Sequence, residues 1–536
     1  MMDAPLTLTH LLDRGARLHP AKEVVSLAGD GSVTRIGWAG VRERAARLAG
    51  ALLRLGLRRG DRVATLAWNT HRHLELYFAV PAIGGVLHTV NARLSPGQVA
   101  RIVAHAGDRF LFADADLVSL ADGVEGLEAR VVLDGRPPVP GWQDYEELVR
   151  GATPAEPVRL DENEAAALCY TSGTTGDPKG VLYSHRALAL HTLTISLPDA
   201  FALGERDVIL PAVPMFHATA WGLPFAAALS GATLVLPGPR PGADLLASLL
   251  EDERVTFAAG VPTVWWGVLD ELRRAPRRLS RRLRIHSGGA PTPAALVRGY
   301  DDLGVEILSG WGMTELSPVG MVCRPRAAMA EWDEERLLRV RTSQGTPLPF
   351  VEARVVDEEG RGVAADGRAA GELEVRGPWV AAAYYPGAGG ETEGGEVGPQ
   401  AGWRDGWLRT GDVATVDAWG YVRLVDRTKD LIRSGGEWIS SVQLEDALMD
   451  HPAVADVAVV AAPDDRWGER PVACVVFREG SVPEDPASVL EALGGRFPSW
   501  WRPDRVEMLG ALPRTTTGKV DKKLLRRLVT PPSRET

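Results

Sequence analysis

The chain has 536 residues, is 45% hydrophobic and 24% charged, and carries a formal net charge of -10. This composition excludes a disordered or collagen-like chain and is typical of a globular protein of about two to four structural units. The acidic balance also argues against general binding to nucleic acid.

Hydropathy and cysteine content predict a cytoplasmic protein without membrane insertion. The sequence contains no apolar run of about 18 residues, the length that a membrane-spanning helix needs. Polar residues such as Asp13 and Arg14 interrupt the first apolar segment, so we expect no secretory signal. The three cysteines, Cys169, Cys323 and Cys474, are too few for a disulfide framework and too scattered for a structural zinc site.

Short apolar runs alternate with helical patterns between about residues 62 and 308. The strands predicted from them are 62–68, 207–213, 232–236, 255–259, 283–286 and 305–308. The predicted helices are 243–253, 262–274 and 292–303. This alternation indicates parallel sheets covered by helices, and in such folds ligands bind at the carboxyl ends of the strands.

The pattern changes after residue 345, where short strands at 353–356 and 372–375 predict a β-rich unit. A glycine-rich stretch at 386–398 is expected to be a mobile surface loop. A small mixed unit then begins near residue 431, with a helix at 441–449, strands at 454–460 and 471–477, and helices near 487–493 and 520–528. The predicted fold class is therefore α/β: a large N-terminal domain of parallel α/β subdomains plus a β-rich subdomain, followed by a small α+β C-terminal domain.

A loop rich in glycine and hydroxyl side chains joins two apolar runs at residues 170–180, with the sequence YTSGTTGDPKG. Glycines let backbone N–H groups approach phosphate oxygens, hydroxyls donate further hydrogen bonds, and an ammonium group neutralises charge. The candidate phosphate-binding residues are Thr171, Ser172, Gly173, Thr174, Thr175, Gly176 and Lys179. A Walker A motif is disfavoured, because the Gly518-Lys519 pair has Pro513 where that motif requires its first glycine.

Lysine is rare in this chain: six of the 60 cationic residues are lysines and the other 54 are arginines. Such a skew suggests a coding bias toward arginine, so the remaining lysines are candidates for sites that a planar guanidinium does not fit. Three of the six, Lys179, Lys429 and Lys519, fall in motifs, whereas the other three could be ordinary surface residues.

Five segments together resemble the adenylate-forming superfamily, which contains acyl-CoA synthetases, adenylation domains of peptide synthetases and firefly luciferases. The loop at 170–180 resembles its phosphate loop, SGWGMTE at 309–315 its aromatic-Gly-x-Thr-Glu motif, and TGD at 410–412 its ribose-binding turn. DRTKD at 426–430 is similar to its interdomain hinge, and PRTTTGK at 513–519 to its C-terminal catalytic segment. The five occur in the family's order, which makes the resemblance specific.

The resemblance implies a domain organisation and a two-step reaction with ATP, Mg²⁺ and coenzyme A. It divides the chain into an N-terminal domain at 1–425, a hinge at 426–430 and a mobile C-terminal domain at 431–536. A carboxylate attacks the α-phosphorus of ATP, so the site must offset the charge of two anions.

Lys519 is the catalytic residue that the resemblance implies, because it would bridge the attacking carboxylate and the α-phosphate. Thr314 would donate to phosphate, and Glu315 would help to hold Mg²⁺. Two structural alternatives stay open: Glu315 could be a solvated loop acid, and Lys519 could be an ordinary helix lysine.

The nucleoside is expected to lie against Trp311, which would cover one face of adenine. The family more often has tyrosine at this position, so the stacking should survive without the phenol's hydrogen bond. The glycine-rich positions around the purine are Gly288, Gly289, Ala290, Gly310 and Gly312. Asp412 would accept from the ribose hydroxyls, and Arg427 would support the same sugar or form a structural ion pair.

Two further segments resemble bacterial medium- and long-chain fatty-acyl-CoA synthetases. The first is PMFHATAW at 214–221, in which Trp221 would gate an acyl tunnel and His217 could lie near the substrate carboxylate or fill the core. The second is GGEWISS at 435–441, which would form a pantetheine tunnel after the small domain rotates about Lys429. The residues of that tunnel would be Gly435, Gly436, Glu437 and Trp438.

The sequence therefore predicts an ATP- and Mg²⁺-dependent acyl-CoA synthetase that makes acyl-AMP from a medium- or long-chain fatty acid and then the CoA thioester. One alternative is an adenylating enzyme for an aromatic or other biosynthetic carboxylate, with a carrier protein or another nucleophile as acceptor. Another is a catalytically silent nucleotide-binding regulator, against which Lys519, Glu315 and Asp412 argue. A homodimer is implied by the fatty-acyl resemblance alone.

Overall fold

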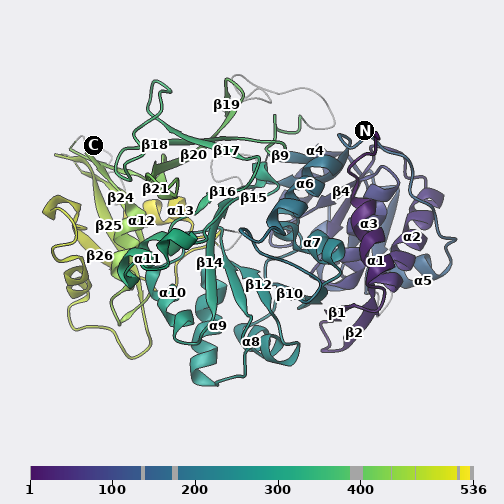
Figure 1. Ribbon diagram of the computed structural model, residues 1–536, viewed down its shortest axis with the longest axis horizontal. Helices are drawn as coiled ribbons and strands as arrows, with labels where there is room; N and C mark the ends of the chain where they lie inside the picture. The colour runs from purple at the N-terminus through teal and green to yellow at the C-terminus, as the bar shows by residue number, and fades with distance from the viewer. Residues whose placement is uncertain are drawn as a thin grey trace.

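The computed structural model describes residues 2–134, 139–171, 179–386, 402–435, 437–464, 466–515 and 519–530. Within these residues the strands form four sheets, of nine, seven, five and five strands. Figure 1 shows the first helices at one end of the molecule and the strands β24, β25 and β26 at the other. The predicted α/β fold class, with a large N-terminal part and a smaller C-terminal part, is confirmed.

The seven-stranded sheet carries the start of the phosphate loop. Its strands, in order across the sheet, are β7 (Gln143–Asp144), β6 (Ala129–Val132), β5 (Asp108–Ala113), β3 (Arg62–Leu66), β4 (Val86–Thr89), β8 (Ala165–Tyr170) and β9 (Gly180–Ser184). β4 and β8 are parallel neighbours, so the segments that follow them leave the same edge of the sheet. β9 returns antiparallel to β8, because a short connection can join only antiparallel neighbours.

The nine-stranded sheet carries the other candidate motifs of the large domain. Its strands, in order, are β16 (Thr346–Pro347), β15 (Val319–Val322), β14 (Glu306–Gly312), β13 (Arg284–Ser287), β12 (Phe257–Gly260), β10 (Val208–Pro211), β11 (Thr233–Leu236), β1 (Glu23–Leu27) and β2 (Val33–Gly37). Pairing is parallel from β1 to β14, as expected, and antiparallel at both edges. The sequence pattern did not identify β1 and β2 as members of this sheet.

Helices cover the two sheets. In the large domain they are α1 (Leu8–Leu18), α2 (Trp38–Arg54), α3 (His71–Ala82), α4 (Pro96–Ala106), α5 (Tyr145–Arg150), α6 (His185–Ile195), α7 (Leu223–Ser230), α8 (Ala243–Asp252), α9 (Pro262–Arg274), α10 (Ala294–Asp301) and α11 (Glu334–Arg341). α9 buries Trp265, Val268, Leu269 and Leu272, the spacing of one helical face. One core cluster contains residues of both sheets, including Val63 and Leu308, so the sheets form a single packed body.

A five-stranded β-rich sheet follows, as the sequence predicts. Its strands are β17 (Glu352–Val356), β18 (Ala370–Arg376), β20 (Trp407–Val416) and β19 (Trp403–Arg404), with β21 (Val422–Arg427) paired to β20. The glycine-rich stretch predicted at 386–398 lies, except for Pro386, outside the described residues.

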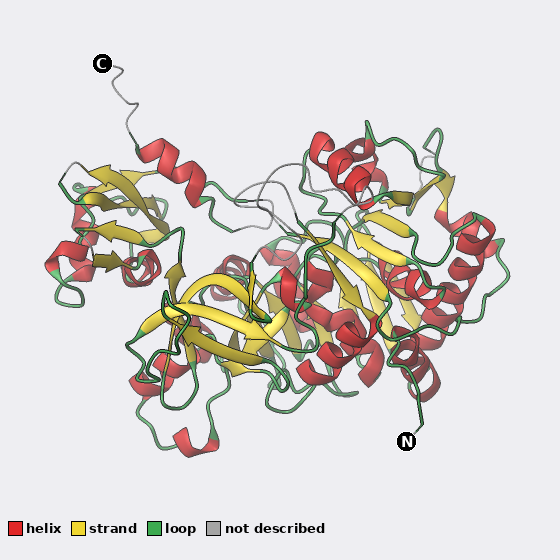
Figure 2. Cartoon of the chain, turned by 90° about the horizontal axis from the view of Figure 1, so that it is seen from above, coloured by secondary structure: helices red, strands yellow, loops and turns green. Residues whose placement is uncertain are grey.

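The C-terminal unit is a separate lobe in Figure 2. Its sheet contains β23 (Glu437–Ile439), β22 (Ile432–Ser434), β25 (Gly468–Phe477) and β24 (Val454–Asp464), with β26 (Arg505–Met508) paired to β25. Its α-helices are α12 (Ser441–Met449) and α13 (Lys522–Val529). The helix expected near 487–493 is a 3-10 helix, Pro486–Leu493. None of the helices in the described ranges combines the length and the apolar character needed to cross a membrane.

Candidate active site

The phosphate-loop candidates occupy the connection between β8 and β9. Thr171 N–H donates to the Lys179 carbonyl at 2.9 Å, and Lys179 N–H donates to Thr171 Oγ1 at 3.3 Å. These two bonds close the loop at its base. Five of the predicted residues, Ser172, Gly173, Thr174, Thr175 and Gly176, lie outside the described residues.

Glu315 lies in the short turn Thr314–Leu316 that follows β14, and it is 5% exposed. Its Oε1 accepts a hydrogen bond of 2.7 Å from the Tyr384 hydroxyl. Burial raises the pKa of Glu315, whereas this bond and the charges of Arg427 and Lys179 lower it. A buried carboxylate that two cations influence is not a solvated loop acid.

Thr314, the other candidate of this turn, is held through its backbone. Its carbonyl accepts a hydrogen bond of 2.6 Å from the Tyr183 hydroxyl. Tyr183 belongs to β9, the strand that leaves the phosphate loop. The bond therefore joins the turn of the nine-stranded sheet to the phosphate-loop hairpin of the other sheet.

Trp311, Asp412 and Arg427 form one hydrogen-bonded group. Asp412 and Arg427 are direct cross-strand partners on β20 and β21, and Arg427 Nε lies 3.2 Å from Asp412 Oδ1. Trp311 Nε1 donates to Asp412 Oδ2 at 2.8 Å. A tryptophan at this position lacks the phenol hydrogen bond of the family's tyrosine, but its indole N–H makes a hydrogen bond to Asp412 instead. Arg427 does form the ion pair that was the structural alternative.

The predicted glycines permit close approach of their neighbours. A Cβ on Gly288 would lie 3.4 Å from the Trp221 ring, and Gly289 has φ +81°. On Gly310 a Cβ would lie 2.4 Å from the His286 ring, and on Gly312 only 2.1 Å from the Pro318 carbonyl oxygen. These positions require glycine for packing whether or not a nucleotide is bound. The exposed Ala290 follows in the same loop as Gly288 and Gly289.

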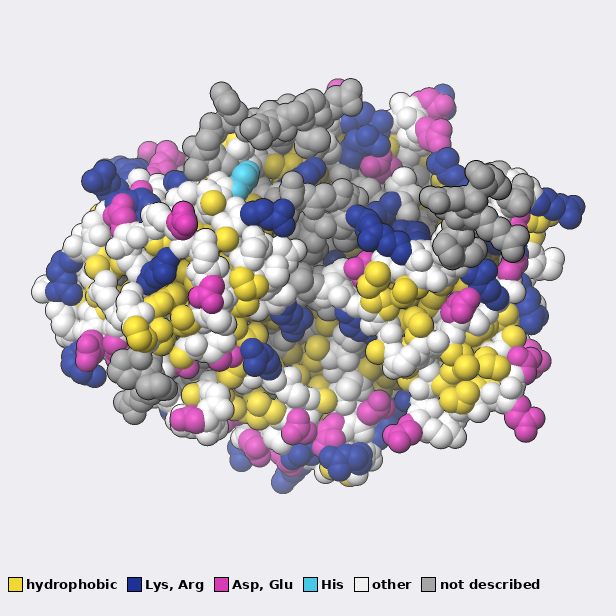
Figure 3. Space-filling view, turned by 180° about the vertical axis from the view of Figure 1, so that it is seen from behind, with side chains coloured by type: hydrophobic (Ala, Val, Ile, Leu, Met, Phe, Trp, Pro, Cys, Tyr) yellow, Lys and Arg dark blue, Asp and Glu magenta, His cyan; other side chains and the backbone are white. Residues whose placement is uncertain are grey.

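Lys519 enters the site from the C-terminal unit. Its carbonyl accepts from Thr515 N–H at 2.7 Å, which shapes a loop and not a helix. Burial lowers the pKa of Lys519 to about 8, with further lowering by Arg427 and Lys429 and an opposing effect of Asp412 and Glu315. The ammonium group therefore lies within electrostatic reach of the carboxylates of both preceding groups. Figure 3 shows Lys and Arg side chains along the central hollow of one face.

His217 lies near Lys519. Burial lowers its pKa to about 4, and the charges of Lys519 and Arg93 lower it further, so the imidazole is neutral at pH 7. Asn69, which follows β3, positions this segment, because its side chain donates to the carbonyl of Val213 at 2.9 Å and accepts from Met215 N–H at 2.7 Å.

Trp221 lies at the end of an unusual turn. Four consecutive residues other than glycine, 218–221, have φ between +37° and +57°, and Gly222 continues at +78°. The Trp221 ring is 6% exposed and meets the His286 ring edge-on at 5.4 Å. The turn thereby holds this ring against Gly288 and Gly289.

The residues predicted to form a pantetheine tunnel lie at the hairpin of β22 and β23 in the C-terminal unit. Trp438 is 40% exposed, and the Arg433 guanidinium lies 4.1 Å from its ring on the same hairpin. Gly435 has φ +61° and packs against Trp467. Gly436 and the side chain of Glu437 lie outside the described residues.

Sequence reasoning missed two residues of this region. Tyr384 is 69 positions from its hydrogen-bond partner Glu315 along the chain, and no motif marks it. Arg93 follows β4, a strand beside β8 that the sequence pattern did not predict. Both depend on pairing between distant segments, which hydropathy does not reveal.

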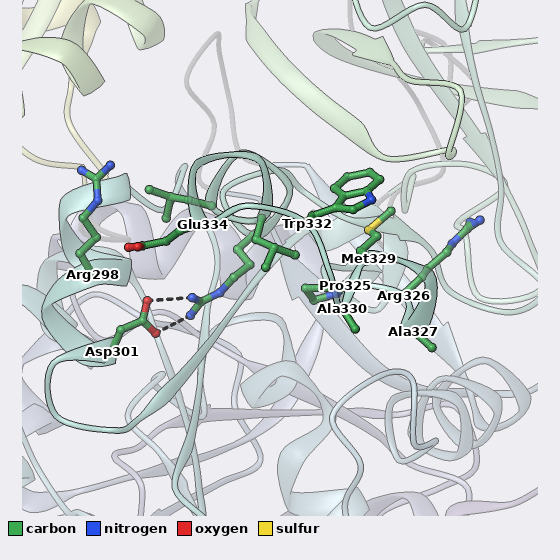
Figure 4. A pocket seen from close by; sticks show the side chains of 12 residues that line it. Arg298, Asp301, Pro325, Arg326, Ala327, Met329, Ala330, Trp332 and Glu334 are labelled. Carbon is green, nitrogen blue, oxygen red and sulfur yellow. Dashed lines mark hydrogen bonds and ion pairs between the residues drawn. The ribbon is translucent and has the colours of Figure 1, made fainter.

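A pocket of about 560 Å³ lies elsewhere on the surface, between α10, the turn Ala327–Met329 and α11. Figure 4 shows the Asp301–Arg341 ion pair on one side of it and Trp332 on the other. None of the candidate site residues lines this pocket. It is therefore separate from the site built around Lys519.

The residues present fit a magnesium ion that is brought by a nucleotide. In the described part of the chain no group of three or more His, Cys, Asp or Glu side chains could hold a metal by itself. Glu315 offers one carboxylate beside the phosphate-loop lysine. Mg²⁺ is commonly bound by one or two carboxylates together with substrate phosphates and water, and this donor set matches that pattern.

Comparisons with known proteins show the family of this chain. The model of the family described as AMP-binding enzyme matches residues 12–385, and that of the AMP-binding enzyme C-terminal domain matches residues 443–519. A long-chain-fatty-acid–CoA ligase of Thermus thermophilus is 48% identical, with 98% of this chain and 96% of the relative covered. A medium-chain-fatty-acid–CoA ligase of Ectopseudomonas oleovorans is 41% identical, with 98% and 96% covered.

Solved structures of CoA ligases have a similar fold. The anthranilate CoA ligase AuaEII in complex with anthranoyl-AMP has a TM-score of 0.86 at 25% identity, with 98% of each chain covered. A benzoate CoA ligase from Burkholderia xenovorans has a TM-score of 0.82 at 25% identity, with 97% and 99% covered. By motifs, fold and family match together, the chain belongs to the AMP-binding enzyme family of the adenylate-forming superfamily.

Proposed function

We propose that this protein converts a medium- or long-chain fatty acid into its CoA thioester through an acyl-adenylate. The protein is an AMP-forming acid–CoA ligase, and ligases of this family use ATP and CoA. One observation carries the proposal: Lys519 of the small unit lies where Asp412 and Glu315 of the large unit influence its pKa. A nucleotide bound between those two carboxylates would meet the lysine.

The first step is displacement at phosphorus. A carboxylate oxygen of the acid forms a bond to the α-phosphorus of ATP, and the bond to the bridging oxygen of pyrophosphate breaks. Lys519 bridges the two anions and neutralises charge in the transition state, while Lys179 faces the departing pyrophosphate. Asp412 accepts from the ribose hydroxyls, with Arg427 and Trp311 holding its two oxygens.

Glu315 and Thr314 are the residues proposed to hold Mg²⁺ and phosphate at this step. The ion supplies charge neutralisation for the phosphates when it is bound. Glu315 would supply one carboxylate to hold the ion, and Thr314 would donate its hydroxyl to phosphate. Neutral His217 adds no charge of its own, and its ring N–H would donate one hydrogen bond to the substrate carboxylate.

The second step is acyl transfer to sulfur. The CoA thiol releases its proton to solvent, its sulfur forms a bond to the acyl carbon, and AMP leaves with the electron pair of the broken acyl–oxygen bond. Lys519 has no task here, so we propose that the unit at 431–536 rotates about Lys429, within the hinge at 426–430, relative to the domain at 1–425. The segment with Trp438, solvent-facing in the present arrangement, would then line the path of pantetheine.

The substrate proposal rests on Trp221 and on the relatives. The ligases of Thermus thermophilus and Ectopseudomonas oleovorans are named for long- and medium-chain fatty acids. A 3-methylmercaptopropionyl-CoA ligase of Ruegeria lacuscaerulensis, 42% identical with 98% of both chains covered, is named for a much shorter acid.

A cytoplasmic location and a homodimer stay predictions from the sequence.

ATP–pyrophosphate exchange tests the assignment of Lys519. In the presence of a fatty acid, Lys519→Ala should lower the exchange rate about 10²- to 10³-fold, because one preorganised donor to the transition state is lost. Lys523→Ala, which removes an exposed lysine of α13 nearby, should exchange like wild type. Equal exchange by the two variants would show that the assignment is wrong.

Acid specificity is tested by measuring AMP formation with aliphatic acids of increasing length and with aromatic acids, each with and without CoA. We expect the highest kcat/KM for a medium- or long-chain acid, and release of AMP that depends on CoA. Accumulation of an acyl-AMP that CoA does not consume would favour another acceptor. No turnover with any acid would favour a regulator.

A further inference from the structure

We propose that Tyr384 is a positioning residue for adenylation: its hydroxyl fixes the Glu315 carboxylate and its ring fixes the Lys179 ammonium, so that both groups are in place when ATP and Mg²⁺ arrive. The inference rests on the proposed function, since it concerns the metal and phosphate groups of the same site.

The segment at 381–384 holds Glu315 at two points. The Tyr384 hydroxyl donates to Glu315 Oε1 at 2.7 Å, and Ala381 N–H donates to the Glu315 backbone carbonyl at 2.7 Å. A hydrogen bond to an ionised acceptor is roughly twice as strong as one between neutral groups. The side chain of Glu315 is therefore held in one direction by a residue that carries no charge.

The same tyrosine holds Lys179. Lys179 Nζ lies 4.6 Å from the centre of the Tyr384 ring, within the range of a cation–π contact. An aromatic face attracts an ammonium group without neutralising it, whereas a carboxylate partner would cancel its charge. Lys179 is thus held near the phosphate loop with its charge still available to phosphate.

Tyr384 also keeps the two charges separate. Glu315 and Lys179 both contact Tyr384, so the two charged groups are near one another. Across the described ranges, however, no ion pair joins these two side chains. A direct pair would occupy the carboxylate that a metal needs and the ammonium that a phosphate needs. A neutral residue that binds both groups prevents this competition.

The surroundings lock Tyr384 itself. The Trp403 ring meets the Tyr384 ring edge-on at 5.0 Å, and Trp403 Nε1 donates to the Ala381 carbonyl at 2.8 Å. The neighbouring Trp379 accepts through its carbonyl from Ser317 Oγ at 3.0 Å. Hydrogen bonds therefore hold the segment at 379–384 against the turn that carries Glu315. The position of Tyr384 does not depend on a ligand.

Direct binding of a non-hydrolysable ATP analogue tests the proposal with the full-length chain, by calorimetric titration in Mg²⁺ and in EDTA. Tyr384→Phe removes only the hydroxyl, so we expect about tenfold weaker binding in Mg²⁺ and unchanged binding in EDTA. Tyr384→Leu also removes the ring, so binding should weaken in EDTA as well.

Tyr385→Phe is the matched control, because it removes a neighbouring phenol hydroxyl that donates to the Ala106 carbonyl at 3.1 Å. It should bind like wild type under both conditions. In a Glu315→Gln background, Tyr384→Phe should cause no further loss in Mg²⁺, since its effect acts through that carboxylate.

Wild-type affinity of Tyr384→Phe in Mg²⁺ would overturn the proposal, and so would an equal loss in Mg²⁺ and EDTA. Thermal unfolding of each variant shows whether a loss of binding comes from a loss of fold. These results are independent of the proposed function, which is tested by acid-dependent exchange in the wild type. A wild type that binds the nucleotide as described but activates no acid would refute the function and leave the role of Tyr384 standing.

Discussion

At the scale of single residues, Trp311 stands where the adenylate-forming family more often has tyrosine. Its indole N–H still makes a hydrogen bond in the candidate site. The indole N–H reaches Asp412 Oδ2 at 2.8 Å, while Arg427 contacts the other oxygen. The carboxylate that is proposed to bind ribose is therefore held on both sides. Because this contact uses the ring nitrogen, it is lost in any aromatic residue that lacks a donor at that point.

Trp311→Phe should raise the KM for ATP about tenfold with a smaller change in the KM for the fatty acid. The expected cause is the freed Asp412 side chain, since a hydrogen bond to a charged group contributes about 1.5–3 kcal/mol. Steady-state kinetics with varied ATP measures it. Trp38→Phe loses a comparable indole hydrogen bond, to the Ala232 carbonyl at 2.9 Å, and should change stability but not the KM for ATP. An equal rise in both variants would contradict the interpretation.

At the scale of an element, the turn at 218–222 is strained. Left-handed backbone costs about 1–2 kcal/mol for each residue that carries a Cβ, and four such residues follow one another here. Strain of this kind persists only where the surroundings enforce it, and it is common at ligand sites. Here the turn places Trp221 against the glycines after β13.

Gly222→Ala should destabilise the protein by about 2–4 kcal/mol. The new alanine would keep the backbone φ of +78°, and its Cβ would lie 2.8 Å from the buried His191 ring. Thermal unfolding should show a lower Tm. Gly97→Ala, in the first turn of α4 with no atom within 4 Å of the new Cβ, should leave the Tm unchanged or slightly higher. An unchanged Tm for Gly222→Ala would show that the turn relaxes without cost.

At the scale of the whole molecule, contacts near the proposed hinge join the small unit to the strand β21 of the large one. The Asp426 carboxylate, at the end of β21 and at the start of the proposed hinge, accepts from Ser441 N–H at 2.7 Å and from Ser441 Oγ at 2.6 Å, at the first turn of α12. Lys522, which belongs to the same small unit as Ser441, donates to Ser441 Oγ at 2.5 Å and so supports this contact from within the unit. A rotation about Lys429 would break the two hydrogen bonds between Asp426 and Ser441. These bonds therefore stabilise the present arrangement of the two units.

Lys429→Pro should separate the two half-reactions. Proline fixes φ near about −65°, so the hinge residue could no longer change its backbone angle. We expect ATP–pyrophosphate exchange to stay within about threefold of wild type while CoA-thioester formation falls at least about 100-fold. Lys429→Ala, which leaves the backbone free, should keep the ratio of the two rates. If both rates fell equally in Lys429→Pro, the residue would not be the pivot.

The sequence by itself determined the class of fold and most of the candidate site. Alternating apolar runs and helical patterns are local properties, and they predicted β10 to β14 with α8, α9 and α10 to within a few residues. Motif chemistry is local too, since glycines, hydroxyls and a lysine in one loop already indicate phosphate binding. The scarcity of lysine pointed to Lys519 and Lys179 before any contact was known. Lys522, which composition left as an ordinary surface residue, is instead paired with Glu445 at 2.7 Å.

The tertiary structure decided everything that depends on distant segments meeting. The place of β1 in the nine-stranded sheet, the Trp311–Asp412 bond and the link from Tyr384 to Glu315 join residues far apart in the chain. Hydropathy and motif spacing report what each residue prefers locally, but not which remote partner satisfies it. The approach of Lys519 to the carboxylates of the large domain depends further on how two separately folded units are oriented, and that orientation is fixed only by contacts between them.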